Sequence, residues 1–311
     1  MPRTRRAGKS VNVSPTNGEE LLPSCNGPKL HPFKGKSLNI DFQSRLNESS
    51  LSDSLSEGKG QSFVFKALIG SKPFAIKLFK FFDIEEARAL FEDFQNDEMP
   101  DDVFVGNVDP FFAECRAYGR IDEFYKKHLG KKNPGLIAVP CHGYIYITKE
   151  QEASLRSQFG SLEWNRANSD ADKQIRALVK QFIPNESIDT KVRSIRRMAM
   201  DLKTLQSIGV YPRDICARNY RGGLLVDFGM ALTEPSCVLN VLPEWMARKE
   251  RKRDLGAFDE MIQELGIKTS VRAARTADRQ IQTRAEYTLY GLRDDFVELD
   301  ASGKRAKTAR V

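Results

Sequence analysis

The order in which strands and helices are predicted along residues 38–265 constrains the fold more than any single motif. Two β-rich runs, SFVFKALIG and SKPFAIKLFKFF, flank a short turn and predict a β-hairpin. A long helix follows, with Asp109 as its cap and Pro110 at its first position. Strands return in GLIAVPCHGYIYIT, predicted as two strands broken at residues 140–143, and in IRALVKQFI. The chain beyond Pro184 is mostly helical, so the sequence predicts an α+β fold with two lobes.

The composition excludes several classes of protein. The 311 residues are 40% hydrophobic and 29% charged, which is typical of a soluble chain with one large or two modest domains. No apolar run is long enough to span a membrane, and the N-terminus lacks the apolar core of a secretory signal, so we expect neither a membrane protein nor a secreted one. Five scattered cysteines without a CxxC pair argue against metal clusters and disulfides and favour a reducing compartment. All three histidines lie at or before residue 142, which excludes a mechanism that needs a histidine in the second half.

Positive charge is concentrated in three places. The net charge is +7, and basic residues cluster in residues 3–9, 248–253 and 304–310. Such clusters are solvated tails and faces, or they contact nucleic acid, an acidic partner or a nuclear import receptor. The expected partners are therefore a protein, as partner or substrate, and chromatin or nucleic acid through the basic tails.

Composition also divides the chain into three regions. Residues 1–37 are rich in Pro, Gly, Ser, Asn and basic residues and predict a mostly disordered basic arm. A folded domain is predicted over residues 38–265, with an N-terminal lobe over 38–184 and a C-terminal lobe over 185–265. Residues 266–311 predict a helical and basic C-terminal tail.

The segment RDICARNYRGGLLVDFG, residues 213–229, contains three side chains in an order that suits phosphoryl transfer. Such a site must hold a triphosphate with its magnesium ion and orient a hydroxyl nucleophile. Asp214 is the candidate carboxylate for the hydroxyl proton. Asn219, five residues later, and Asp227, before Phe-Gly, are the candidate oxygen ligands of Mg²⁺. Each motif alone is weak, whereas their joint occurrence in this order favours a common site.

Residues further upstream supply the remaining parts of an ATP site. Gly58 and Gly60 lie between predicted strands, at the first two glycines of a G-x-G-x-x-G-x-V pattern, and Val64 directly follows the position of the third glycine. The run FAIK places Lys77 on a strand and matches V-A-I-K. Glu114 lies in the first turns of the next helix, where it can pair with Lys77 and direct it toward the phosphates. We therefore predict ATP contacts from the two glycines, Val64 and Lys77, and catalytic roles for Lys77 and Glu114.

Together with KGKSLNIDF, DPFFAECRAYGRI and AVPCHGYI, these motifs resemble the protein-kinase fold. More closely, the chain is similar to a fungal kinase-like family that includes an inner-kinetochore complex subunit. The resemblance covers roughly residues 40–265. It implies a two-lobed kinase-like domain in a protein of the nucleus, with the cytoplasm as the alternative. The site motifs themselves predict ATP and Mg²⁺ as ligands.

The chain also departs from the kinase pattern. Pro212 stands where kinases have the histidine of H-R-D, and Phe63 replaces the third glycine of the loop. The link between residues 219 and 227 is short, as is the segment 229–244. Asp254 matches the helix aspartate that braces the catalytic loop from beneath, and little chain follows it for further helices. The sequence therefore predicts a kinase-like fold with a reduced C-lobe.

Three functions fit these residues. The leading hypothesis is an ATP- and magnesium-binding, protein-kinase-like phosphotransferase acting on a Ser or Thr hydroxyl of a protein. The alternative is a catalytically weak or inactive kinase-like scaffold subunit of a nuclear complex, at the kinetochore or on chromatin, which the missing glycine and the reduced C-lobe favour. A small-molecule kinase of the aminoglycoside or choline type shares the same Asp, Asn and Asp logic. The D-F-G and the V-A-I-K-like strand argue against this third hypothesis.

Overall fold

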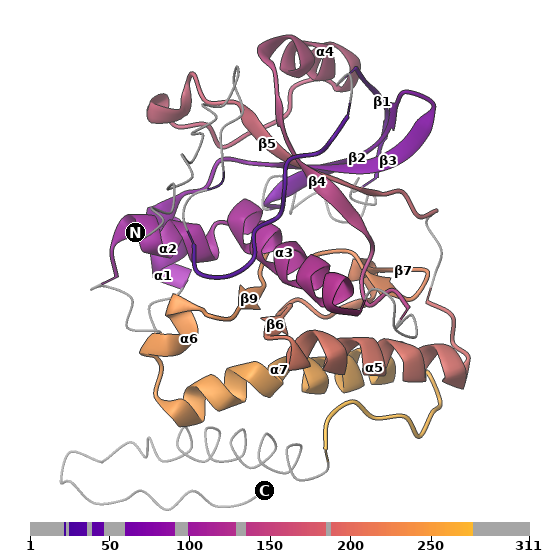
Figure 1. Ribbon diagram of the computed structural model, residues 1–311. Coiled ribbons are helices and arrows are strands. Elements are labelled where there is room, and N and C mark those ends of the chain that lie inside the picture. Colours follow the sequence, from indigo (N-terminus) through magenta and orange to yellow (C-terminus); the bar gives the residue numbers. More distant parts are fainter. Residues whose placement is uncertain are drawn as a thin grey trace, which may run out of the picture.

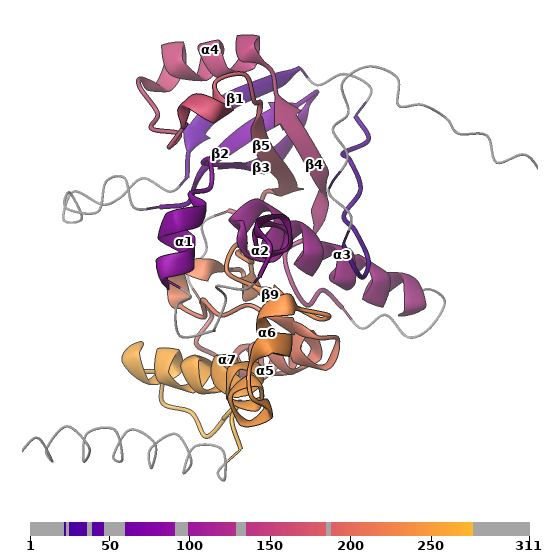
Figure 2. The ribbon, with the colours of Figure 1, turned by 90° about the vertical axis from the view of Figure 1, so that its left-hand side faces the viewer.

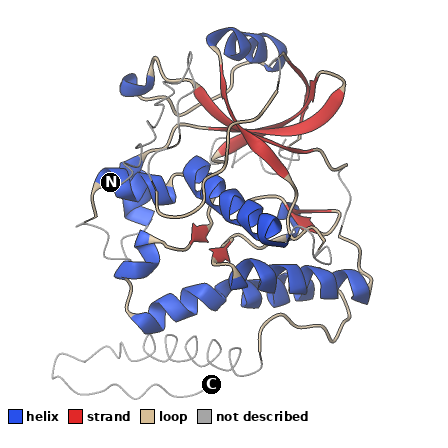
Figure 3. Ribbon diagram, viewed as in Figure 1, coloured by secondary structure: helices blue, strands red, loops and turns tan. Residues whose placement is uncertain are grey.

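A computed structural model of the chain has two lobes stacked one above the other (Figure 1). The structure describes residues 22, 25–35, 39–46, 60–90, 99–128, 135–184 and 188–275. The upper lobe is built on a five-stranded sheet with helices against both faces, and the lower lobe is mostly helical (Figure 3). The predicted α+β class with two lobes is therefore confirmed. Within the described ranges, no helix is both long and apolar enough to cross a membrane.

The sheet of the upper lobe is antiparallel throughout, with the strand order β1-β2-β3-β5-β4. Its strands are β1 (Ile40–Arg45), β2 (Ser62–Ile69), β3 (Lys72–Phe79), β4 (Cys141–Ile147) and β5 (Ile175–Gln181). The predicted hairpin is confirmed: β2 and β3 pair directly and turn at Gly70, whose φ of 62° is left-handed and suits glycine. Because β3 pairs with β2 on one side and β5 on the other, it lies in the middle of the sheet.

Side chains of the central strand alternate between two cores. On the outer face, α4 (Lys149–Phe159) covers the sheet (Figure 2), and Ile76 and Leu78 belong to the apolar cluster beneath it. Phe79 belongs instead to the larger core on the inner face. Successive strand residues point to opposite faces, so Lys77 projects toward the inner face with Phe79.

Helix α3 (Pro110–His128) lies against the inner face of the sheet, between the two lobes. Its predicted start is confirmed, because the Asp109 carboxylate accepts the Phe111 backbone N–H at 2.9 Å. The helix is covered on both sides, and Glu114 is among its buried residues. The two shorter helices before it are α1 (Ile84–Leu90) and α2 (Asp101–Val108).

The lower lobe packs two long helices beneath α3 (Figure 1). Its helices are α5 (Val192–Ser207), α6 (Cys237–Val241) and α7 (Glu244–Glu264). Two-residue strands connect them: β6 (Val210–Tyr211), β7 (Tyr220–Arg221), β8 (Leu224–Leu225) and β9 (Leu232–Thr233). Strand β6 pairs with β9 and β7 with β8, which folds the chain between α5 and α6 into a compact set of loops. The small number of helices in the described part of this lobe fits the predicted reduced C-lobe.

Residues 25–35 differ from the sequence expectation of a disordered arm, because they form a strap across α3 and β4. Leu30 is 2% exposed, and the Phe33 N–H donates to the Tyr144 carbonyl of β4 at 2.9 Å. The strap passes so close to α3 that a Cβ added at Gly119 would lie 2.6 Å from its backbone. The predicted disorder therefore does not extend through this segment.

The run GLIAVPCHGYIYIT forms one strand rather than the predicted two. Only β4 is a strand, and residues 135–140 before it run as a loop. The Val139 N–H donates to the Leu225 carbonyl of β8 at 3.0 Å, so this stretch joins the two lobes instead of extending the upper sheet.

Candidate functional site

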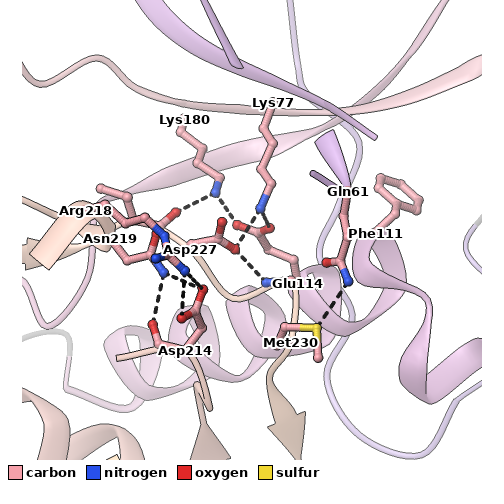
Figure 4. Close-up of polar contacts among 12 residues, drawn as sticks. Gln61, Lys77, Phe111, Glu114, Lys180, Asp214, Arg218, Asn219, Asp227 and Met230 are labelled. Atoms are coloured by element: carbon pink, nitrogen blue, oxygen red, sulfur yellow. Dashed lines mark hydrogen bonds and ion pairs between the residues drawn. The ribbon is translucent and has the colours of Figure 1, made fainter. Parts of the chain in front are cut away.

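Side chains predicted to share one site come from five separate parts of the chain to the region between the lobes (Figure 4). They are Lys77 of β3, Glu114 of α3, Asp214 of the loop after β6, Asn219 at the end of a 3₁₀ turn (Ala217–Asn219), and Asp227 of the loop after β8. The strand alternation of β3 and the buried position of α3 direct the first two toward each other. The hairpin of the short strands β7 and β8 lies between Asn219 and Asp227 in the chain and brings these two residues into the same region.

Lys77 is held by two carboxylates. Its Nζ donates to Glu114 Oε2 at 2.8 Å and to Asp227 Oδ1 at 2.7 Å, with its side chain 6% exposed and that of Glu114 fully buried. Burial by itself lowers the pKa of Lys77, but the two carboxylates outweigh burial and raise that pKa above its usual range. For Asp227, burial raises the pKa, and the ammonium groups of Lys77 and Lys180 outweigh it and hold the pKa well below its usual range. Lys77 and Asp227 are thus both charged at neutral pH.

Lys180 of β5 is a further member of this cluster that sequence reasoning missed. Its Nζ donates to Glu114 Oε1 and to the Val226 carbonyl, the latter at 2.7 Å, and its side chain is 5% exposed. Each oxygen of Glu114 therefore binds one ammonium, and α3 is tied to both β3 and β5. In the sequence this lysine is one polar residue in an apolar run, typical of a strand lysine that reaches water. Only the pairing of β5 with β3, which sets Lys180 opposite Ala75, brings it to Glu114.

The predicted phosphate-binding loop precedes and enters β2. Gly58 lies outside the described residues, and Gly60 lies just before the strand. Val64 pairs with Lys77 across the hairpin, and directly opposite residues of two antiparallel strands project from the same face. Val64 therefore shares the inner face with the lysine, as an ATP contact there requires.

Two other side chains of this loop, Phe63 and Gln61, point in different directions. Phe63, in place of the third glycine, is buried in the outer core with its ring centroid 5.1 Å from that of Trp164. The bulky replacement therefore points away from the inner face. Gln61 instead donates its Nε2–H to the sulfur of Met230 at 3.3 Å, so the loop is in direct contact with the segment after the D-F-G (Figure 4).

Asp214 is surrounded by donors from its own loop. The Asn219 amide donates to Asp214 Oδ2 at 2.9 Å and to its backbone carbonyl at 3.0 Å. Arg218 donates to both carboxylate oxygens, at 3.3 Å and 3.2 Å. The thiol of Cys216 lies 3.5 Å from Oδ1, and burial raises its pKa to about 11, which keeps it protonated as a donor. The sequence analysis did not single out Arg218 or Cys216.

A buried aspartate beneath this loop fixes its backbone. Arg213 has a φ of 68°, a left-handed conformation that is costly for a residue with a side chain. Its N–H donates to Asp254 Oδ1 of α7 at 2.9 Å, which confirms the predicted brace. Asp254 is 1% exposed, and burial raises its pKa to about 7 despite this hydrogen bond. Its Oδ2 has no hydrogen-bond partner in the part of the chain that the structure describes, which agrees with a carboxyl that resists ionisation.

The residues after Asp227 determine its orientation. Phe228 is fully buried, with its ring centroid 5.2 Å from that of Tyr118 on α3. The Gly229 N–H donates to Asp227 Oδ1 at 2.8 Å. A Cβ at Gly229 would lie 3.3 Å from that oxygen and 3.4 Å from Lys77 Nζ, so glycine keeps this corner of the site uncrowded.

Asp227 and Asn219 fit a magnesium ion shared with a nucleotide better than a permanent metal centre. No three His, Cys, Asp or Glu side chains gather as metal ligands anywhere in the described ranges. Mg²⁺ is commonly held by one or two protein oxygens, water and substrate phosphates. The Asp227 side chain is 35% exposed, and the Asn219 contact with Asp214 uses its amide nitrogen and not its amide oxygen. Both residues thus retain an oxygen suited to that role.

Comparison with known proteins identifies a family and also finds distant structural likenesses. The family described as "Kinetochore Sim4 complex subunit FTA2" matches residues 19–232, a range that includes every predicted site residue. The structure of vaccinia related kinase 3 is similar over 68% of this chain, at 13% sequence identity and a TM-score of 0.33. This chain spans about half of that kinase chain, 53%, and a likeness at this level carries no argument about fold or activity. No curated protein sequence matches the chain.

Proposed function

Because the chain belongs to the FTA2 family of kinetochore Sim4 complex subunits, we propose that it is an assembly subunit of such a complex. Its kinase-like domain binds a nucleotide with Mg²⁺ but transfers phosphate slowly or not at all. The predicted similarity to a family with an inner-kinetochore subunit is confirmed by this membership. Membership in a kinetochore family also implies a nuclear protein with protein partners, as the sequence predicted.

One observation supports slow phosphotransfer. A general base must direct a free lone pair at the proton that it removes. Both carboxylate oxygens of Asp214 accept hydrogen bonds from Arg218, and one of them also accepts from Asn219. A hydroxyl substrate would have to displace the guanidinium before it could reach Asp214.

The lysine cluster supports retained nucleotide binding. An ammonium fixed by a buried carboxylate and a partly exposed aspartate beside it are the parts that hold triphosphate oxygens and their magnesium ion in kinases. Lys77, Glu114 and Asp227 have this arrangement at 2.8 Å and 2.7 Å. Bound magnesium would neutralise phosphate charge, while Lys77 and Asp227 would position it.

Nucleotide binding is tested by thermal denaturation of the full chain with ATP, in the presence and absence of Mg²⁺. A ligand at about 100 times its Kd stabilises the folded state by about 2.7 kcal/mol. We expect Asp227→Asn to lose the magnesium-dependent part of this protection. The matched control is Asp172→Asn, because the Asp172 side chain is 95% exposed and pairs with Lys149 rather than with a residue of the cluster. Equal protection of wild type and Asp227→Asn would contradict nucleotide binding at this site.

Phosphotransfer is tested by ADP release and autophosphorylation of wild type beside Asp214→Ala. Equal rates in the two proteins support the assembly function. The second candidate function is an active protein-kinase-like phosphotransferase, favoured by the intact Lys77–Glu114 pair. A wild-type rate about 100-fold or more above that of Asp214→Ala would establish this candidate, since general-base catalysis contributes about 10²–10⁴-fold.

A further inference from the structure

Helix α7 presents an exposed stripe that combines a tryptophan with a run of cations. Trp245 is 67% exposed, the largest exposed fraction among the large apolar side chains of the described residues. Exposed basic residues follow it along the helix at intervals of three and four. We call this set the α7 stripe; it consists of Trp245, Arg248, Lys249, Lys252 and Arg253. At about 100° per residue these positions share one side of the helix.

The opposite side of α7 anchors the helix in the lower lobe. Ala247, Phe258 and Met261 are buried there, and Asp254 holds the catalytic-loop backbone. Arg251, between the stripe residues in sequence, turns away and pairs with Glu234 at 2.8 Å. The stripe is therefore carried by a fixed element, so its side chains need little ordering when a partner binds.

Two cations of the stripe, Arg248 and Arg253, make only loose ion pairs with glutamates of their own helix. Arg248 lies 3.8 Å from Glu244, with the two side chains 69% and 71% exposed. Arg253 lies 3.8 Å from Glu250 and is 52% exposed. Exposed pairs at such separations contribute little to stability. Their positive charge is thus available to an anionic partner, and stabilisation of the fold does not explain why these cations are present.

Trp245 gives the stripe an apolar end. Val241, at the end of α6 and four residues earlier in the chain, is a second exposed apolar side chain, at 42%. Tryptophan and arginine are the residues most enriched at the energetic centres of protein–protein interfaces. A duplex nucleic acid presents a phosphate backbone that makes no use of an exposed indole, so the tryptophan favours a protein partner.

We propose that the α7 stripe docks an acidic amphipathic helix of a protein partner, with an apolar side chain against Trp245 and carboxylates facing the basic residues. The stripe runs for about 12 Å, from the rise of about 1.5 Å per residue, which corresponds to about two turns of a partner helix. Carboxylates three and four residues apart on that helix repeat with the same spacing as the cations. This inference rests on the proposed assembly function and identifies a surface that serves it.

Tryptophan fluorescence of the full chain gives a local readout, because the chain has two tryptophans. Trp164 is 6% exposed and Trp245 67% exposed, so acrylamide quenching reports mainly on Trp245. The probe is a tryptophan-free peptide of about 18 residues, about five turns, with leucines along one face and glutamates beside them. We expect a blue-shifted emission and reduced quenching on binding, both retained in Trp164→Phe. Titration at two salt concentrations should show weaker binding at the higher one.

The charge contribution is tested by Arg248→Glu combined with Arg253→Glu, with peptide affinity read by fluorescence anisotropy of a labelled probe. We expect binding to weaken about 100-fold, because like charges then face each other. The matched control, Arg196→Glu with Lys203→Glu on exposed positions of α5, makes the same change in net charge and should weaken binding less than about 3-fold.

Three results would overturn the proposal. They are unchanged Trp245 emission at saturating peptide, equal losses in the α7 and α5 variants, and tighter binding of a duplex of about 20 base pairs than of the peptide at physiological salt. Circular dichroism of each variant ensures that a loss is not caused by misfolding. ATP protection is measured on the same samples, so failure of the stripe and failure of the nucleotide site are distinguished.

Discussion

Glu114 and Asp214, two carboxylates of the same candidate site, differ in where their cationic partners come from and in how far they are buried. Glu114 is fully buried and binds an ammonium with each of its oxygens, one from β3 and one from β5. Asp214 is 41% exposed, and its cation is Arg218 of the same loop, itself 74% exposed. The first carboxylate connects three elements of the fold, whereas the second organises only its own loop.

This difference separates what the fold needs from what a reaction would need. A buried carboxylate that loses its partners leaves uncompensated charge in a dry interior, so its environment is costly to change. An exposed carboxylate can exchange one donor for another or for water at little cost. The presence of Lys77, Glu114 and Asp227 at short distances therefore does not by itself indicate activity, because stability alone would retain such a cluster. Evidence on activity has to come from the exposed half of the site.

The largest effect should follow removal of the charge that the buried cluster shares. In Glu114→Gln, two ammonium groups remain with one carboxylate, Asp227, and we expect the free energy of unfolding to fall by about 3–5 kcal/mol in urea denaturation. The control is Glu123→Gln on the same helix, whose carboxylate contacts Arg120 and Lys127 near the surface, and we expect no measurable loss there. Similar losses in the two variants would show that the buried cluster contributes no more to stability than an ion pair near the surface.

The next effect is a change in stability with pH that is caused by Asp254, the buried carboxyl beneath the loop of Asp214. Burial raises the pKa of Asp254 from 3.8 to about 7, and at about 1.4 kcal/mol for each pH unit this corresponds to roughly 4 kcal/mol. The folded chain keeps the Asp254 proton up to about pH 7, whereas the unfolded chain loses it near pH 3.8. The folded state therefore binds more protons across this window, and its stability falls as pH rises from about 4 to about 7.

Asp254→Asn is neutral at every pH and keeps an oxygen for the Arg213 N–H. We expect the stability of wild type relative to this variant to decrease between about pH 4 and pH 7 and to stay constant above that range. Urea denaturation of both proteins at each pH measures the difference, and all other titrating groups cancel. A difference that does not change with pH would show that Asp254 ionises normally.

A smaller loss is expected when one ammonium of the cluster is removed and the other remains. In Lys180→Met, Glu114 keeps Lys77, while the Val226 carbonyl loses its donor. We expect the free energy of unfolding to fall by about 1–3 kcal/mol, the cost of an unsatisfied buried polar group. A loss equal to that of Glu114→Gln would mean that Lys180 alone accounts for the stability of the cluster.

The smallest effect should follow a change at the exposed carboxylate. We expect Arg218→Ala to change the free energy of unfolding by about 0.5 kcal/mol or less, because the pair with Asp214 is exposed. Any phosphotransfer should rise at the same time, since Asp214 would lose its strongest competitor for a substrate hydroxyl. Thermal melts and ADP release from the same preparation check both expectations, and a lower rate would show that Arg218 assists the reaction.

Local chemistry made much of the fold and site predictable. The hairpin of β2 and β3 and the Asp109 cap of α3 follow from patterns within a few residues. The five charged or amide groups of the site could be found because phosphoryl transfer needs them in a fixed chain order. Their roles in nucleotide binding and catalysis remain predictions.

Features that depend on pairing between distant segments were not predictable. Lys180 resembles an ordinary strand lysine until β5 is placed beside β3. Arg218 and Cys216 are unremarkable in the sequence because their contact with Asp214 depends on the turn of the loop. The strap over residues 25–35 was missed because its composition resembles a disordered arm, although β4 and α3 supply its partners.

The strap also determines where the chain can be shortened. A truncated protein that starts at residue 38, the domain boundary expected from composition, would lack Leu30 and the backbone hydrogen bonds to Tyr144. It would expose apolar surface of α3 beside Gly119 and promote aggregation. Recombinant versions for crystallisation or reconstitution should therefore retain the residues from about 19 onward, where the family match begins.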